Sequence, residues 1–202
     1  MIARVETKMC QIENANSESD CKILERTAAV LAEGHGRTMQ EIADKSGVGR
    51  TTLYRRFHTR EDLLRAIFEQ AISEAREGIA AANPDEGDAR EAMMRVIEEM
   101  LKIGDKYRVL FQEKSAHNER AEGKDEFLES LRDLIRRAQR EGAIDTSLPL
   151  DWVLGTMGAM VATAIRLIGT GELARNHAAA LITRTLFDGV GASVPVSEIP
   201  LS

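Results

Sequence analysis

Aromatic residues are scarce in this 202-residue chain and make up only 4% of it. Because hydrophobic residues reach 43%, the core must consist mainly of aliphatic side chains. The four prolines and the lack of alternating apolar stretches argue against a β-sandwich or barrel. No uninterrupted apolar run reaches the roughly 18 residues of a membrane helix, and residues 1–19 lack a signal-peptide core. We therefore expect no membrane partner.

Patterns that would indicate an enzyme are also missing. Cys10 and Cys21 fit neither a metal site nor a disulfide framework, which favours a cytoplasmic location. Gly47-Val48-Gly49 lacks the third glycine and the preceding strand of a phosphate-binding loop. Glu113 and His117 lie four residues apart on one predicted helix, but such a pair more often makes a surface hydrogen bond. We expect no cofactor, no metal and no enzymatic activity.

Charge is unevenly distributed along the chain, whose formal net charge is −6. Residues 1–70 hold 11 basic and 11 acidic side chains, whereas residues 71–202 hold 16 and 22. Between Lys45 and Arg60 there are five basic residues and no acidic one. A basic surface on an acidic protein is typical of a face that binds an anion. A solvated helix face, balanced by acids elsewhere, would give the same pattern.

Apolar residues recur at helical spacing along most of the chain, and turn and cap signals separate the helices. Thr38 and Glu41 have the spacing of a capping box. Residues 1–19 and 191–202 are predicted to be flexible tails. Helices are predicted over residues 19–33, 38–46, 50–57, 59–82, 89–104, 106–121, 125–141, 150–168 and 173–187.

The segment from Met39 to His58 has the spacing of a helix-turn-helix. Ala43 is small enough for two helices to cross closely, and Gly47 tolerates the positive φ of a tight turn. Leu53 and Phe57 share the face that would attach the third helix to the first two. A short helix with arginine and threonine on its other face fits the major groove of DNA. The outward residues are Arg50, Thr51, Thr52, Arg55 and Arg56.

The string TMQEIADKSGVGRTTLYRRF at 38–57, followed by TREDLL at 59–64, resembles the DNA-binding signature of the tetracycline-repressor (TetR) family. The resemblance covers residues 20–70, and TLYRRF is its most specific part. It implies an all-α fold, with a three-helix helix-turn-helix DNA-binding domain over 20–66. A C-terminal helical bundle for dimerisation and ligand binding would follow over 67–190.

The resemblance also implies a role for individual side chains. Thr38 and the Tyr54 hydroxyl would contact phosphate, and Arg55 or Arg56 would neutralise the DNA backbone. Arg60 stands where family members often carry lysine, and it would meet phosphate too. Gly49 and His58 depart from the usual pattern, which weakens the start of the third helix slightly and leaves the role of His58 open.

Family members usually dimerise through their last two helices. Small residues in the predicted helix 150–168 suit a close helix–helix approach, and its apolar surface runs nearly all round it. A central helix of a monomeric bundle would show the same composition. The predicted interface residues are Gly155, Gly158, Ala159, Ala162, Leu181 and Thr185.

The same family encloses an apolar ligand in the C-terminal bundle. Methionine adapts to variable apolar ligands, although apolar residues at helical spacing more often form plain core. The lining favours a small apolar or amphipathic effector over a sugar or nucleotide. The predicted pocket residues are Met93, Ile97, Met100, Leu101, Tyr107, Phe111, Phe127, Leu131, Trp152, Met157 and Met160.

We therefore expect a homodimeric transcription regulator that binds a near-palindromic double-stranded DNA operator. Most family members repress, so we expect a repressor that a small molecule releases from DNA. The alternative is a helical protein-interaction or scaffolding module without specific DNA binding. The basic stretch from Lys45 to Arg60 argues against this alternative. A small helical enzyme would require a catalytic constellation, and none is found in the sequence.

Overall fold

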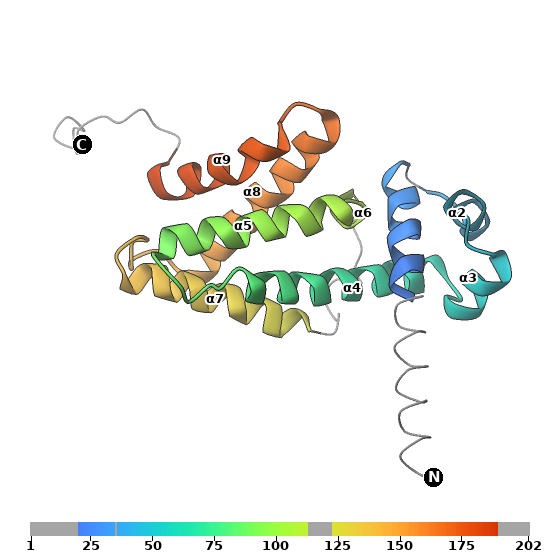
Figure 1. Cartoon of the computed structure of the whole chain (residues 1–202), viewed down its shortest axis with the longest axis horizontal. Helices are drawn as coiled ribbons and strands as arrows, with labels where there is room; N and C mark the ends of the chain where they lie inside the picture. Colours follow the sequence, from blue (N-terminus) through green and yellow to red (C-terminus); the bar gives the residue numbers. More distant parts are fainter. Residues whose placement is uncertain (1–19, 35, 113–122, 190–202) are drawn as a thin grey trace, which may run out of the picture.

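The computed structural model describes residues 20–34, 36–112 and 123–189, and the side chains of 111 and 112 are excluded. Within these ranges the chain forms helices and turns and no strand, so the all-α prediction is confirmed (Figure 1). The predicted tails 1–19 and 191–202 lie outside the described residues. A first helix covers 20–32; the others are α2 (Met39–Ser46), α3 (Arg50–Arg56), α4 (Arg60–Ala81), α5 (Ala89–Lys106), α6 (Val109–Gln112), α7 (Lys124–Arg140), α8 (Leu150–Thr170) and α9 (Arg175–Asp188).

The helix over 20–32, α2 and α3 form a small unit that we call the head. Leu31, Ile42 and Leu53 come from its three helices, and each is 0% exposed in one shared core. These apolar residues bring the helices together because none of them could bury its own apolar stripe alone. The head therefore has a core of its own, at one end of the molecule (Figure 1).

The long helix α4 belongs to both parts of the molecule. Leu63 and Ile67, near its start, are buried in the core of the head. Ile79, near its end, is buried in the second core, which α5, α7, α8 and α9 share. We call this second part the bundle. Because one rigid helix carries residues of both cores, a shift of its C-terminal half within the bundle also moves the head.

The helix α5 is central to the bundle and packs against α4, α7, α8 and α9. Its buried residues include Met93, Val96 and Ile97, each 0% exposed, at the spacing of one helical face. Asp88 caps it by accepting a hydrogen bond from the Arg90 amide at 2.8 Å. The apolar pattern of the sequence thus identified the correct buried face.

The prediction of one helix over 106–121 is wrong at its start. The helix α5 continues through Gly104 to Lys106, and a turn at residues 107–108 separates it from α6. Gly104 is buried within α5, where a glycine is tolerated because neighbouring helices pack against it. Tyr107 ends α5 with its side chain 1% exposed, since its ring is anchored in the interior. Residues 113–121 of the predicted helix lie outside the described residues.

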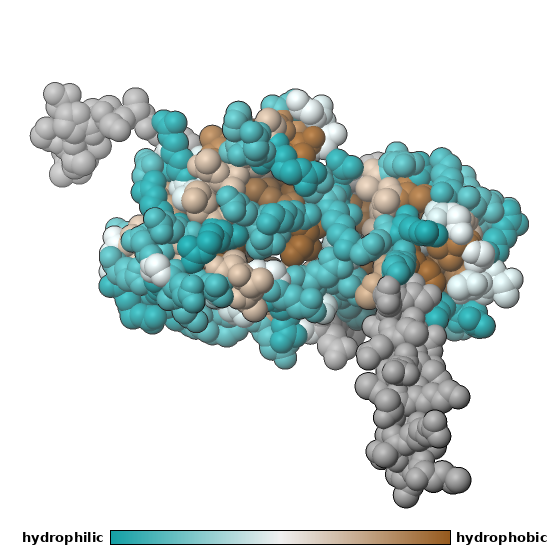
Figure 2. Space-filling model, in the orientation of Figure 1, coloured by the Kyte–Doolittle hydropathy of each residue, from teal (hydrophilic) through white to brown (hydrophobic). Residues whose placement is uncertain are grey.

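The helix α8 is largely apolar, but its surface is only partly buried. By length and composition alone, it is apolar enough to cross a membrane, although the chain has no uninterrupted apolar run of that length. Val153, Met157 and Val161 pack into the bundle core, as expected for a core helix. However, Trp152 is 67% exposed on the same helix. Hydrophilic residues cover most of the surface in Figure 2, but hydrophobic areas remain visible over the bundle and the head.

Candidate functional site

The helix α2 begins with a complete capping box. The Thr38 hydroxyl oxygen accepts from the Glu41 amide at 3.3 Å, and the Thr38 amide donates to the Glu41 carboxylate at 2.7 Å. The Thr38 hydroxyl also donates to that carboxylate at 2.8 Å. The backbone bond from Thr38, followed by the hydroxyl bond, lowers the pKa of Glu41. The Thr38 hydroxyl is therefore engaged with Glu41 in this structure.

A tight turn connects α2 to α3. Gly47 has φ 69°, in the left-handed region that glycine adopts without strain. Gly49 precedes α3 and offers no side-chain cap. Leu53 then buries the inner face of α3 in the core of the head, together with Ile42 and Val48. This packing determines which residues of α3 face outward.

The outer face of α3 presents hydroxyl, aromatic and cationic side chains to solvent. Arg50, Thr51, Tyr54 and Arg55 are exposed, and Tyr54 is 46% exposed although it is a large aromatic residue. Thr38, at the start of α2, is also exposed. The structure thus leaves these five predicted contact residues accessible on the surface of the head. Three further predicted residues, Thr52, Arg56 and Arg60, are half-buried.

Two arginines of the basic stretch are paired with acidic residues. Asp44 accepts from Arg50 Nε at 3.0 Å and from Arg50 Nη2 at 2.8 Å. Arg56 pairs with Asp20 of the first helix, 36 positions earlier in the sequence. The stretch from Lys45 to Arg60 contains no acidic residue, but acidic residues from outside it lie next to two of its arginines in the folded chain. Arg56 ties α3 to the first helix, whereas Arg55 points its charge to solvent.

An apolar cavity of about 320 Å³ lies in the bundle, between α4, α5, α7 and α8. Phe68, Tyr107 and Phe127 contribute aromatic rings to its wall. Lys124, the first residue of α7, is the only charged residue among the described residues of the wall. The volume falls at the lower end of the roughly 300–1,000 Å³ typical of small-molecule sites. The cavity can thus hold a compact apolar molecule or the apolar part of a larger one.

The predicted pocket residues divide into separate groups. Met100, Tyr107 and Phe127 line the cavity. Trp152 points to solvent, and Met160 lines a groove between α8 and α9. The side chain of Phe111 lies outside the described residues. Helical spacing marks a residue as buried, but it does not show whether the residue meets a neighbouring helix or a cavity. The remaining predicted residues therefore lie in the packed core and not in the cavity wall: Met93, Ile97, Leu101, Leu131 and Met157.

The predicted interface residues do not all lie on one surface. Ala159, Leu181 and Thr185 lie together in the groove between α8 and α9. Gly155 is exposed on α8, and a Cβ added there would have open space around it. Gly158 lines the cavity. Ala162, the sixth predicted residue, is half-buried.

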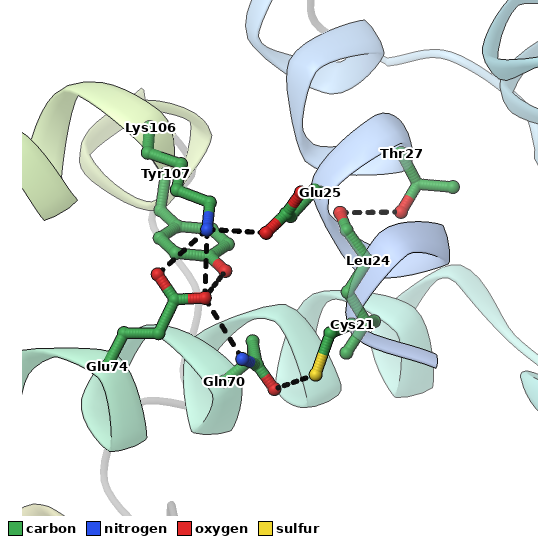
Figure 3. Close-up of polar contacts among 8 residues, drawn as sticks. All are labelled: Cys21, Leu24, Glu25, Thr27, Gln70, Glu74, Lys106 and Tyr107. Atoms are coloured by element: carbon green, nitrogen blue, oxygen red, sulfur yellow. Dashed lines mark hydrogen bonds and ion pairs between the residues drawn. The ribbon is translucent and has the colours of Figure 1, made fainter. Parts of the chain in front are cut away.

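A polar network joins the head to the bundle (Figure 3). Lys106, at the end of α5, donates to Glu25 of the first helix at 2.6 Å and to both carboxylate oxygens of Glu74 on α4 at 2.9 Å. The Tyr107 hydroxyl donates to Glu74 at 2.7 Å. Gln70 donates to Glu74 at 3.0 Å and accepts from the thiol of a fifth residue, Cys21, at 3.4 Å. The end of α5 therefore meets α4 at Glu74, and the first helix joins the network through Lys106 and Gln70.

The electrostatics of this network favour the charged forms of Glu74 and Lys106 and the neutral form of Tyr107. Burial by itself raises the pKa of Glu74, but the bonds from Gln70, Tyr107 and Lys106 together lower it below the usual value. Burial would lower the pKa of Lys106, and the bonds to Glu25 and Glu74 raise it instead. Burial and the Glu74 bond raise the pKa of the Tyr107 hydroxyl. Glu74 thus stays ionised and Tyr107 neutral near pH 7.

Tyr107 belongs to the cavity wall and to this network at once. Sequence reasoning named Tyr107 but missed Glu25, Glu74 and Lys106, because contacts 32 to 81 positions apart leave no pattern in the sequence. It also missed Phe68 and the contribution of α4 to the wall. The apolar residues Phe68, Ala71, Ile72 and Ala75 follow helical spacing, and this signal could have marked them as a buried face of α4, though not as a cavity wall.

Comparisons with known proteins agree with this geometry. The bacterial regulatory proteins of the tetR family share a sequence pattern that matches residues 23–67. The HTH-type transcriptional repressor LfrR of Mycolicibacterium smegmatis is 35% identical over 82 residues, which cover 41% of this chain and 43% of that repressor. The alignment thus spans less than half of either protein.

The similarity in structure extends much further along the chain. The TetR-like regulator LfrR from Mycobacterium smegmatis, in complex with proflavine, has a TM-score of 0.73 at 25% identity, covering 89% of this chain and 99% of that one. FadR from Bacillus subtilis, in complex with stearoyl-CoA, has a TM-score of 0.67 at 16% identity and covers 84% and 98%. At that identity, the second match concerns the fold alone. Taken together, these comparisons show that residues 23–67 carry the sequence pattern of the tetR family of bacterial regulatory proteins, and that most of the chain shares the fold of a TetR-like regulator.

Proposed function

We propose that this chain is a cytoplasmic, homodimeric DNA-binding repressor that a small amphipathic molecule releases from a near-palindromic operator. The observation that carries the proposal is the outer face of α3, where Arg50, Thr51, Tyr54 and Arg55 are exposed together. Hydroxyl and guanidinium groups on a short helix suit phosphates and base edges in a major groove. The related LfrR is named a transcriptional repressor, which supports repression here.

Two heads are needed to bind a palindrome, and α8 and α9 offer the surface for a second copy. Leu181 is 50% exposed on α9, and Trp152 is 67% exposed on α8. The groove between these helices is lined mainly by apolar residues, among them Met160 and Leu167. Exposed large apolar side chains beside a groove favour association, because a partner removes their surface from water. We propose that both copies use this face.

Replacing Leu181 with glutamate should separate the two copies. The change places a charge without a partner in the proposed interface, and burying such a charge is costly. We expect the wild-type chain to sediment with the mass of two chains, and Leu181→Glu with the mass of one. Leu148→Glu is a matched control, since Leu148 is 40% exposed in the loop before α8, outside the groove. A Leu181→Glu protein that retains the dimer mass would exclude this face.

The effector would occupy the cavity between α4, α5, α7 and α8. Aromatic rings of Phe68, Tyr107 and Phe127 suit an apolar or planar ligand, and Lys124 stands at the start of α7 on the same wall. The similar structures contain proflavine in LfrR and stearoyl-CoA in FadR, so this fold accepts apolar and amphipathic molecules. Neither molecule is assigned here; both serve as probes.

We propose that the network at Glu74 transmits occupancy of the cavity to the head. A ligand that displaces the Tyr107 ring disturbs its hydrogen bond to Glu74. Glu74 also holds Lys106, which reaches Glu25 on the first helix of the head. A ligand shifts the head only if it binds one arrangement of this network better than the other. The proposal therefore requires that the ligand favour a second arrangement, in which these bonds are broken.

Selection from random duplexes tests the proposed function without knowledge of the operator. We expect the full chain to enrich a near-palindromic motif, with binding in the range of roughly 10⁻⁸ to 10⁻¹¹ M. Affinity should fall steeply between two salt concentrations as phosphate contacts are screened. Proflavine and stearoyl-CoA are then tested separately for release. A chain that enriches no sequence would instead support the protein-interaction alternative.

A further inference from the structure

The first residue of α3 makes an ion pair that the proposed function does not explain. Arg50 reaches back across the turn to Asp44 on α2 and makes two bonds to its carboxylate, at 3.0 Å from Nε and 2.8 Å from Nη2. The Arg50 and Asp44 side chains are 54% and 51% exposed. The pair is therefore accessible to a duplex, in the part of the head where the two helices meet.

The geometry of the pair leaves part of the guanidinium available. A guanidinium has five N–H donors, and Asp44 accepts from one on Nε and one on Nη2. Both donors of Nη1 and the second donor of Nη2 remain on the outer edge. Two parallel donors of this kind match the O6 and N7 acceptors of guanine in the major groove. The Asp44 carboxylate also holds the Arg50 guanidinium in one orientation, so this side chain loses less rotational freedom on binding.

The charge of the pair distinguishes base reading from phosphate binding. Together Arg50 and Asp44 carry no net charge, so the pair adds little to the nonspecific attraction for a duplex. The pair still presents the guanidinium N–H groups that do not bond Asp44, and these can make directional hydrogen bonds to a base. Arg55 is also exposed on α3, but no described acid pairs with it, and it suits the backbone role better. Arg56 is turned toward Asp20 in the first helix.

We propose that Asp44 is a specificity-determining residue, which positions the Arg50 guanidinium to read a guanine in each half-site. This inference rests on the proposed DNA-binding function and adds a residue on α2 that would contact no DNA itself. Without Asp44, Arg50 gains freedom and net charge, so it binds phosphates of any sequence as readily as one base. Discrimination should fall while nonspecific affinity stays constant or rises.

Random-duplex selection with full-length variants tests this inference. Wild type should enrich a motif with a guanine at one position of each half-site. In Asp44→Asn and Asp44→Ala that position should lose its preference, with the wrong-base penalty reduced by a large part of the roughly 5- to 150-fold expected for a bidentate arginine–guanine pair. Asp44→Glu, which keeps a carboxylate, should restore part of the preference, and Arg50→Lys should lose it.

A charge-matched control separates positioning from simple removal of a negative charge. Glu33→Gln removes an acid that pairs with Arg37 in the head, outside α2 and α3. It should leave the motif unchanged. If Asp44→Asn keeps the guanine preference and only binds all duplexes more tightly, the inference is overturned and Asp44 is a repulsive surface charge. If wild type enriches no motif, the proposed function fails first, and the inference fails with it.

Discussion

Replacing Arg50 and Tyr54 together with alanine should reduce affinity for the selected duplex roughly 100-fold or more, toward the nonspecific level. The change removes the fork at the start of α3 and the exposed aromatic side chain one turn later. Neither residue belongs to the core of the head, since the Arg50 side chain is 54% exposed and Tyr54 is 46% exposed. The fold should survive, so thermal unfolding measured in parallel should change little.

The control for this double variant lies in the bundle. Arg136→Ala with Leu148→Ala removes one exposed arginine and one exposed apolar residue, 42% and 40% exposed, far from α3 in the sequence. It should bind the selected duplex as the wild type does. Equal binding by the α3 double variant would show that α3 does not carry recognition, and the protein-interaction alternative would then be preferred.

The second large effect concerns communication between the cavity and the head. Lys106→Met removes the bonds to Glu25 and Glu74 but keeps an unbranched apolar stem. Coupling between two sites typically changes affinity by roughly 5- to 150-fold. We therefore expect the fold-change in DNA affinity that the effector causes to be at least about fivefold smaller in this variant than in the wild type. The measured quantity is the ratio of duplex affinities with and without proflavine or stearoyl-CoA, whichever releases the wild type.

Lys102 provides a matched control on the same helix, about one turn earlier. It pairs with Glu99 within α5 and makes no described contact with the head. Lys102→Met should preserve the full response to the effector. Direct binding of the probe, measured by titration without DNA, shows whether the cavity of each variant is still occupied. If Lys106→Met binds the probe and responds like the wild type, the network does not couple the two sites.

The ends of the helices depend on residues that lie close together in the sequence. Thr38 with Glu41, predicted from their spacing, and Thr59 with Asp62 both form capping boxes in the structure, each between residues three positions apart. Such bonds depend on neighbours in the sequence, so spacing alone predicts them. The same holds for Gly47, whose position between two apolar patterns indicated the turn that the structure contains. The head was therefore predictable to the level of individual helices.

The placement of side chains within the bundle was less predictable. Helical spacing marked Met93 and Met157 as buried and so as candidates for a pocket, but both lie in solid core. Phe68 of α4 lines the cavity instead, because this long helix extends from the head along the bundle. Spacing defines the buried face of a helix, and it leaves open which other helix, or which hollow, that face meets.

Residue order alone was sufficient for the all-helical class, the caps and the helix-turn-helix, since each depends on contacts within a few residues. Only the tertiary structure revealed three ion pairs: Arg56 with Asp20, Arg50 with Asp44, and Lys106 with Glu25. These contacts depend on the angles at which rigid helices cross. Crossing angles arise from the packing of whole side-chain surfaces, which no short stretch of sequence encodes.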